Sequence, residues 1–207
     1  MKKVVWSAVA RVAIVAVTLT GVSCGELTRQ GQSAAYLVMN ELVAASGAEP
    51  EEFGGTLFSD VITLVEVDNE RVPTVFADLG RVTLALALKD PGPPTSPNAP
   101  SPNNFITVNR YRVSYTRADG RNTPGVDVPF GFDGAVTFTV GSSAVTHTFE
   151  LVRHIAKEEA PLRALRSGAV IIGAIADVTF FGHDQTGREV SVQGRMLVQF
   201  GNFGDPQ

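Results

Sequence analysis

The chain has 207 residues, one cysteine and a net charge of −4 at pH 7, and 44% of its residues are hydrophobic. An acidic chain without a run of basic residues lacks the electrostatic footprint of a nucleic-acid-binding protein, so we expect no nucleic-acid partner. A single cysteine excludes an intramolecular disulfide, and a chain of this length can bury a core large enough to be stable without one.

The first 23 residues have the order of a secretory signal peptide. Two lysines near the start are followed by an apolar stretch, Val12 to Leu19, and by small residues just before Cys24. The apolar stretch is far shorter than the ~20 residues that a membrane-spanning helix needs. We therefore predict an exported protein, with residues 1–23 as a cleaved signal peptide and residues 24–32 as a polar tether.

The sequence Gly21-Val22-Ser23-Cys24 resembles the lipobox of bacterial lipoproteins, in which the cysteine receives a diacylglycerol group and becomes the new N-terminus. Gly21 stands where these proteins usually have leucine. The resemblance implies that Cys24 is lipidated, that the membrane is a partner through this lipid, and that the protein is a periplasmic, outer-membrane or cell-surface lipoprotein. The alternative is an ordinary cleaved signal peptide, in which Cys24 is incidental.

Residues 33–207 are predicted to form one β domain. Ser33 to Ser46 fits either a helical stripe or an opening strand, and the β-like pattern of the rest favours the strand. Arg81–Lys89 and Arg188–Gln199 alternate apolar and polar residues with a period of two, which is typical of half-buried strands. In the second, Gly194 lies on the buried face and indicates close packing or a bulge. Further strands are predicted at Asp60–Val65, Phe105–Thr116, Ala135–Val140, Val145–His154 and Val170–Phe181.

Turn signals separate these strands. Asp119-Gly120 and Gly141-Ser142-Ser143 are typical of tight turns, and Pro161 to Arg166 suits one helical turn. Residues 90–104 are rich in proline, which cannot join a sheet ladder and predicts an extended loop inside the domain. Short strands joined by Gly, Pro and Asp turns, without a long helix, predict an all-β fold with an antiparallel β-sandwich.

The segment from Ala176 to Ser191 resembles the last hairpin of bacterial immunoglobulin-like and fibronectin-like domains. In those families a strand ends in Asp, two residues follow, and Gly precedes the final strand; here Asp184 and Gly187 match, and Arg188 replaces the usual asparagine. The resemblance implies an immunoglobulin-like sandwich that acts as an interaction or structural module, and it supplies no catalytic residue. The whole chain is also similar to uncharacterised exported proteins of environmental bacteria.

The residue types that carry chemistry show no catalytic or metal-binding spacing. His147 is in register with the apolar face of its strand, which predicts a packed residue, whereas His183 beside a turn is expected to be exposed. The histidines lack a cysteine partner and the spacing of zinc ligands. No nucleophile elbow or phosphate-binding glycine motif occurs. We therefore predict no catalytic residue, no metal site and no cofactor, and we expect that the protein is not an enzyme.

The run from Asp119 to Asp127 is a polar loop with two glycines. Loops on a rigid sandwich often carry binding surfaces, so Asp119, Arg121, Asn122 and Asp127 are candidate binding residues. The alternative is a loop that packs on itself.

Two functions are compatible with these features. The first is a cell-envelope-tethered, non-catalytic interaction or structural module with an envelope protein as partner. The alternative is a β-barrel carrier of a small apolar ligand, which predicts an open interior lined by Phe and Val side chains.

Overall fold

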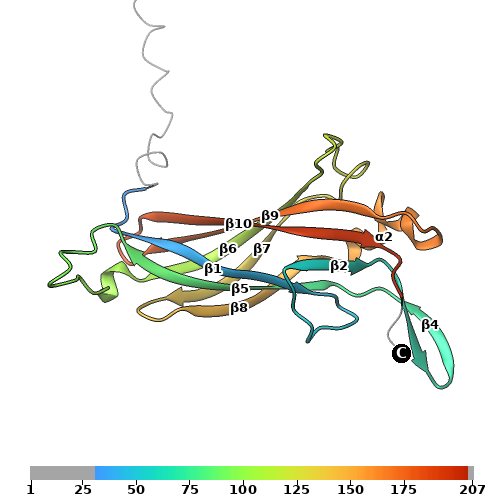
Figure 1. Ribbon diagram of the computed structural model, residues 1–207, viewed down its shortest axis with the longest axis horizontal. Helices are drawn as coiled ribbons and strands as arrows, with labels where there is room; N and C mark the ends of the chain where they lie inside the picture. Colours follow the sequence, from blue (N-terminus) through green and yellow to red (C-terminus); the bar gives the residue numbers. More distant parts are fainter. Residues whose placement is uncertain (1–30, 205–207) are drawn as a thin grey trace, which may run out of the picture.

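The computed structural model describes residues 31–204, which form a β-rich domain with two facing sheets (Figure 1). The predicted signal peptide, Cys24 and all of the tether except its last two residues lie outside the described residues. In chain order the elements are β1 (Ala35–Ala45), β2 (Thr56–Asp60), β3 (Thr63–Val67), β4 (Glu70–Thr74), β5 (Asp78–Leu88), the 3₁₀ turn η1 (Pro102–Asn104), β6 (Ile106–Thr116), β7 (Phe132–Val140), β8 (Val145–Val152), the helix α2 (His154–Glu158), the 3₁₀ helix η2 (Leu162–Ser167), β9 (Ile172–Asp184) and β10 (Glu189–Gly201).

The smaller sheet has the strand order β1-β5-β8 and the larger sheet has the order β2-β10-β9-β6-β7. All neighbours pair antiparallel except β2 and β10, which are parallel. The hairpin of β3 and β4 pairs with neither sheet and extends from one end of the molecule (Figure 1). The preponderance of strands and their antiparallel pairing confirm the predicted all-β class.

Aromatic rings from both sheets fill the middle of the core. The ring centroid of Phe149 on β8 lies 5.1 Å from those of Tyr111 on β6 and Phe180 on β9, and all three residues are buried. Burial of one such ring stabilises the fold by roughly 2–3 kcal/mol. The hydroxyl of Tyr115 on β6 also donates a 2.6 Å hydrogen bond to the carbonyl of Leu151 on β8. Ring packing and this bond therefore join the two sheets without a disulfide.

Most of the strand predictions are confirmed, with ends that shift by up to three residues. The strand predicted at Asp60–Val65 is wrong, because β2 ends at Asp60 and β3 begins at Thr63. The carboxylate of Asp60 accepts hydrogen bonds from the Thr63 hydroxyl at 2.9 Å and from the Phe203 backbone N–H at 3.1 Å. The hydrogen bonds of the Asp60 carboxylate to these two groups compete with the hydrogen bonds of the sheet ladder and stabilise a break between β2 and β3.

The segment between Val145 and Ser167 contains a second correction. The strand predicted at Val145–His154 ends at Val152, because His154 begins the short helix α2. The helical turn predicted at Pro161–Arg166 is confirmed as η2, which buries Leu162 and Leu165. The turn Asp68-Asn69 of the β3–β4 hairpin was not predicted; both residues have positive φ, as type I′ hairpin turns require.

The structure explains why glycine occupies position 194 in β10 and position 187 in the turn before it. A Cβ at Gly194 would lie 2.2 Å from the sulfur of Met39 on β1, and the register with β9 shows no shift there, so the reason is close packing and not a bulge. Gly187 has φ +82°, and its N–H donates to the Asp184 carbonyl at 3.0 Å. The carboxylate of Asp184 accepts bonds from the Thr186 and Arg188 backbone N–H groups. The Asp-x-x-Gly pattern therefore closes the β9–β10 turn.

Candidate functional site

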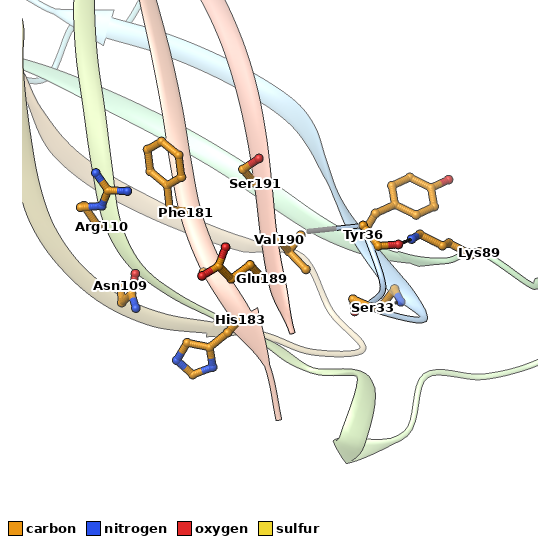
Figure 2. Close-up of a pocket in the computed structure, with 13 residues that line it drawn as sticks. Ser33, Tyr36, Lys89, Asn109, Arg110, Phe181, His183, Glu189, Val190 and Ser191 are labelled. Carbon is orange, nitrogen blue, oxygen red and sulfur yellow. Dashed lines mark hydrogen bonds between the residues drawn. The ribbon is translucent and has the colours of Figure 1, made fainter. Parts of the chain in front are cut away.

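A groove of about 790 Å³ opens at the end of the sandwich where β1 begins and β9 turns into β10 (Figure 2). Side chains of β6, β9 and β10 form one wall, and the start of β1 with Lys89 after β5 forms the other. The groove lies where β2 does not cover β10: among residues 31–204, β2 pairs only with Leu197–Gly201, and the preceding part of β10 pairs with β9 alone. We call it the β1–β10 groove.

Arg110 and Phe181 form the part of the groove wall that belongs to β6 and β9. The guanidinium carbon of Arg110 lies 4.0 Å from the Phe181 ring centroid, which is a cation–π contact. The same guanidinium donates to Asp133 on β7 at 2.9 Å, and Arg112 donates to the other carboxylate oxygen at 2.9 Å. Hydrogen bonds from Arg112 and Arg110 hold the pKa of Asp133 below its usual value, so this carboxylate is ionised and balances charge on the arginines.

A bulge in β6 places Asn109 at the groove. Val108 pairs with Gly182 and Arg110 pairs with the adjacent Phe181, so Asn109 is an extra residue in β6 relative to β9. The extra residue reverses the alternation: Val108 is buried, but Arg110 is exposed. Sequence reasoning missed this bulge. Its signal is the polar pair Asn109-Arg110, which breaks the alternation of the apolar residues on either side.

Glu189 and Ser191 on β10 form the next part of the wall. They pair with His183 and Phe181 across the β9–β10 ladder and lie near them in the groove (Figure 2). Within residues 31–204, the side chains of Asn109, Glu189 and Ser191 make no hydrogen bond and no ion pair. His183, expected to be exposed, is half-buried, and its Nδ1 lies 3.1 Å from the Asp184 carbonyl oxygen.

The opposite wall carries Tyr36 and Lys89, and the ring of Tyr36 points away from the side chains of β9 and β10 (Figure 2). Tyr36 of β1 is 44% exposed, and Lys89 donates through Nζ to the carbonyl of Gly31 (Figure 2). The groove thus combines aromatic rings, two cations, one carboxylate and uncharged polar groups on strands that belong to both sheets.

The four predicted loop residues lie in the connection between β6 and β7, which follows the end of β6 opposite to the groove. The Asp119 carboxylate accepts from Arg117 at 2.6 Å and from Arg121 at 2.8 Å, and these bonds hold the pKa of Asp119 well below its usual range. The side chains of Asn122 and Asp127 accept bonds from the backbone N–H groups of Arg117 and Thr123. The loop therefore packs on itself, and the structure does not bring these residues into the groove. That they form a binding surface stays a prediction.

A second polar cluster is closed to solvent. The Lys157 ammonium of α2 lies 2.7 Å from Asp78 Oδ1 at the start of β5, and the two side chains are 1% and 0% exposed. Asp78 also accepts from the Ser59 hydroxyl at 2.6 Å and from the Gly47 N–H at 3.0 Å. Burial raises the pKa of Asp78, and the attraction of Lys157 opposes this rise. A substrate cannot reach groups at this depth, so the cluster is structural.

His147 is a packed residue, as predicted: its ring stacks on Phe138 with centroids 4.6 Å apart. Among residues 31–204, no three His, Cys, Asp or Glu side chains are grouped so that they could hold a metal ion. None of the helices in this range has the length and apolar character that would let it cross a membrane. Comparison with protein-family models, curated proteins and solved structures gives no match for this chain.

Proposed function

We propose that this protein is a cell-envelope-tethered, non-catalytic interaction module that binds its partner in the β1–β10 groove. The observation that carries the proposal is the state of three polar side chains in that groove. Asn109, Glu189 and Ser191 stand on the strands of a packed sandwich, yet none of them bonds to the rest of the described chain. Hydrogen-bonding groups that are held in place and unused by the fold are available to a ligand.

The strand order supports an immunoglobulin-like or fibronectin-like sandwich. In chain order β1, β5, β6, β7, β8, β9 and β10 take the places of strands A, B, C, C′, E, F and G. The smaller sheet then reads A-B-E and the larger sheet C′-C-F-G, with β2 added parallel to the last strand. This arrangement agrees with the resemblance of the β9–β10 hairpin to those families. Many unrelated functions use such sandwiches, so the proposal rests on the groove and not on the fold.

The proposed tether rests on the order of charged, apolar and small residues that ends at Cys24. A lipid on Cys24 would anchor the chain ten residues before Ala34, directly ahead of β1. The groove opens beside the start of β1, at Gly31 and Ser33. A partner bound there would therefore contact residues that follow the proposed membrane anchor by only a few positions.

The packing of the core favours this module over a β-barrel carrier. A carrier of an apolar ligand needs free space between its sheets. In this protein Phe149 contacts the rings of Tyr111 and Phe180 at the centre, where such a ligand would lie.

Photo-crosslinking in living cells tests the proposal. A photoreactive amino acid replaces Ser191 in the groove or, as a control, Thr137 on β7, which is also exposed. We expect a specific envelope component to be crosslinked from position 191 and not from position 137. The same products from both positions, or none from position 191, would refute the groove as the binding site.

A further inference from the structure

The proline-rich loop, residues 90–104, projects from the sandwich between β5 and β6. It begins beside the start of β1, because Leu88 at the end of β5 pairs with Ala35, and it extends beyond this end of the two sheets (Figure 1). Its prolines are Pro91, Pro93, Pro94, Pro97, Pro100 and Pro102. Proline has no N–H group to give to a sheet ladder and its φ angle is fixed, so the loop stays outside both sheets.

Hydrogen bonds within the loop hold its shape. The Asn98 N–H donates to the Pro91 carbonyl at 2.8 Å, and the Gly92 N–H donates to Asp90 Oδ1 at 3.0 Å. Gly92 has φ +74°, and a Cβ on it would lie 2.9 Å from the Asn98 nitrogen, so the two sides of the loop lie against each other. The loop therefore presents a defined tip to solvent.

Two hydroxyl-bearing residues, Thr95 and Ser96, occupy this tip. The Ser96 N–H donates to the Pro93 carbonyl at 2.9 Å, which closes a β-turn around Thr95. Both residues are exposed, and in the part of the chain that the structure describes neither side chain makes a hydrogen bond. The hydroxyl of Ser101 differs, because it donates to Asn104 Oδ1 at 3.0 Å. The fold thus uses the Ser101 hydroxyl and leaves the two at the tip accessible.

The surroundings of the tip favour a sugar over a phosphate as the group that these hydroxyls carry. Phosphorylated side chains are held by nearby arginine or lysine, but the loop has no basic residue, and the ammonium of the preceding Lys89 donates to the Gly31 carbonyl. Serine and threonine among prolines are typical of O-glycosylated segments. A neutral sugar needs no counter-charge, and at an exposed tip it displaces no packed side chain.

We infer that the tip of the proline-rich loop is an O-glycosylation site, with the hydroxyls of Thr95 and Ser96 as acceptors. The donor is an activated sugar phosphate, and a separate glycosyltransferase acts on the loop. The hydroxyl oxygen bonds to the anomeric carbon of the sugar as the bond from that carbon to the phosphate leaving group breaks. The hydroxyl proton passes to a base of the transferase, and nothing is oxidised. This inference goes beyond the proposed function and does not depend on the β1–β10 groove.

Peptide mass spectrometry of the protein purified from its native cells tests the inference. Trypsin releases the whole loop as one peptide, because no lysine or arginine lies between Lys89 and Arg110. We expect this peptide to exceed the mass of its sequence by whole hexose or N-acetylhexosamine units, and electron-transfer fragmentation should place them on Thr95 or Ser96. Protein made by cell-free synthesis without a glycosyltransferase should give the same peptide at the mass of its sequence.

The double variant Thr95→Ala/Ser96→Ala should lose the added mass completely, whereas the matched control Ser101→Ala should keep it. Because the two tip side chains make no hydrogen bond in the described part of the chain, the double variant should retain the circular dichroism spectrum of the wild type. A loop peptide of unmodified mass, a mass increase that equals phosphate, or an added mass that persists in the double variant would overturn the inference.

Failure of this inference can be distinguished from failure of the proposed function. An unmodified loop in a protein that crosslinks to an envelope component from position 191 would refute the glycosylation alone. A glycosylated loop in a protein that gives no such crosslink would refute the groove as the binding site and leave the glycosylation in place.

Discussion

The buried pair of Asp78 and Lys157 should be the most sensitive point in the structure to a single substitution. The ammonium and carboxylate are 2.7 Å apart and almost fully inaccessible, and the carboxylate also binds Ser59 and Gly47. The cluster thus links α2 to both sheets. Lys157→Met leaves a buried carboxylate without its counter-charge, and Asp78→Asn leaves a buried ammonium in the same state.

The loss can be estimated from the burial of the pair. Removing one partner of a fully buried ion pair costs about 3–5 kcal/mol, because the remaining charge stays desolvated. With a dependence on urea of about 2 kcal/mol per molar, the unfolding midpoint should fall by roughly 1.5–2.5 M. The double variant Asp78→Asn/Lys157→Met carries no buried charge. It should lose only about 1–3 kcal/mol, because the amide replaces the carboxylate that accepts the hydrogen bonds of Ser59 and Gly47. The sum of the single losses would then exceed the double loss by at least about 3 kcal/mol.

Urea unfolding followed by far-ultraviolet circular dichroism measures these differences. Arg112→Met is the matched control, since it removes an exposed ion pair to Asp133 and should leave the midpoint unchanged. A single variant that does not fold, together with a double variant that does, would also support the reasoning. The reasoning would be refuted if the double variant lost as much stability as the two single variants together, or if each single variant lost less than about 1 kcal/mol. Either result would mean that the charge left behind is not desolvated.

Three further predictions concern other parts of the chain. Burial raises the pKa of Asp184, but hydrogen bonds from Thr186 and Arg188 outweigh it and hold the pKa below 3.8. The ionised carboxylate therefore stabilises the fold fully above pH 4, and this contribution is lost as the pH falls further. Asp184→Asn should cost about 2 kcal/mol of stability at pH 7, and its melting temperature should fall less steeply than that of the wild type below pH 4. A variant whose melting temperature falls as steeply as that of the wild type below pH 4 would contradict this. Gly194→Val should cost about 1–3 kcal/mol in urea unfolding by contact with Met39, and Met39→Ala in the same chain should recover part of it; purely additive losses would argue against that contact. Metabolic labelling with a radioactive fatty acid should mark the wild-type protein and not Cys24→Ser, and an unlabelled wild type would rule out the lipoprotein proposal.

Local sequence patterns were sufficient for most of the secondary structure. The period-two alternation in β5 and β10 predicts strands with one buried face, and both lie in the sandwich with that face toward the core. The Asp184-x-x-Gly187 pattern predicts a turn, because its bonds join residues at most four positions apart. Such features depend on neighbouring residues alone and can therefore be derived without the fold.

The candidate site could not be derived in the same way. Ser33 and Glu189 line one groove although they are more than 150 positions apart in the chain, and only the packing of β1 across β10 brings them together. Sequence reasoning selected the polar loop at Asp119–Asp127 because glycines and charges mark exposed turns. The structure shows that bonds within this loop engage those charges.

The all-β class, most strand positions and the turn chemistry could be predicted without the fold, because they follow from side-chain alternation and short-range hydrogen bonds. Which polar side chains the fold uses, and which it leaves free, depends instead on how distant segments pack. Lys157 stands in a charged stretch that looks exposed, yet it is buried against Asp78, 79 positions away. Asn109 and Glu189 look equally ordinary in the sequence and remain unpartnered within residues 31–204. Whether a polar group is satisfied depends on residues that come near it only when the whole chain has folded.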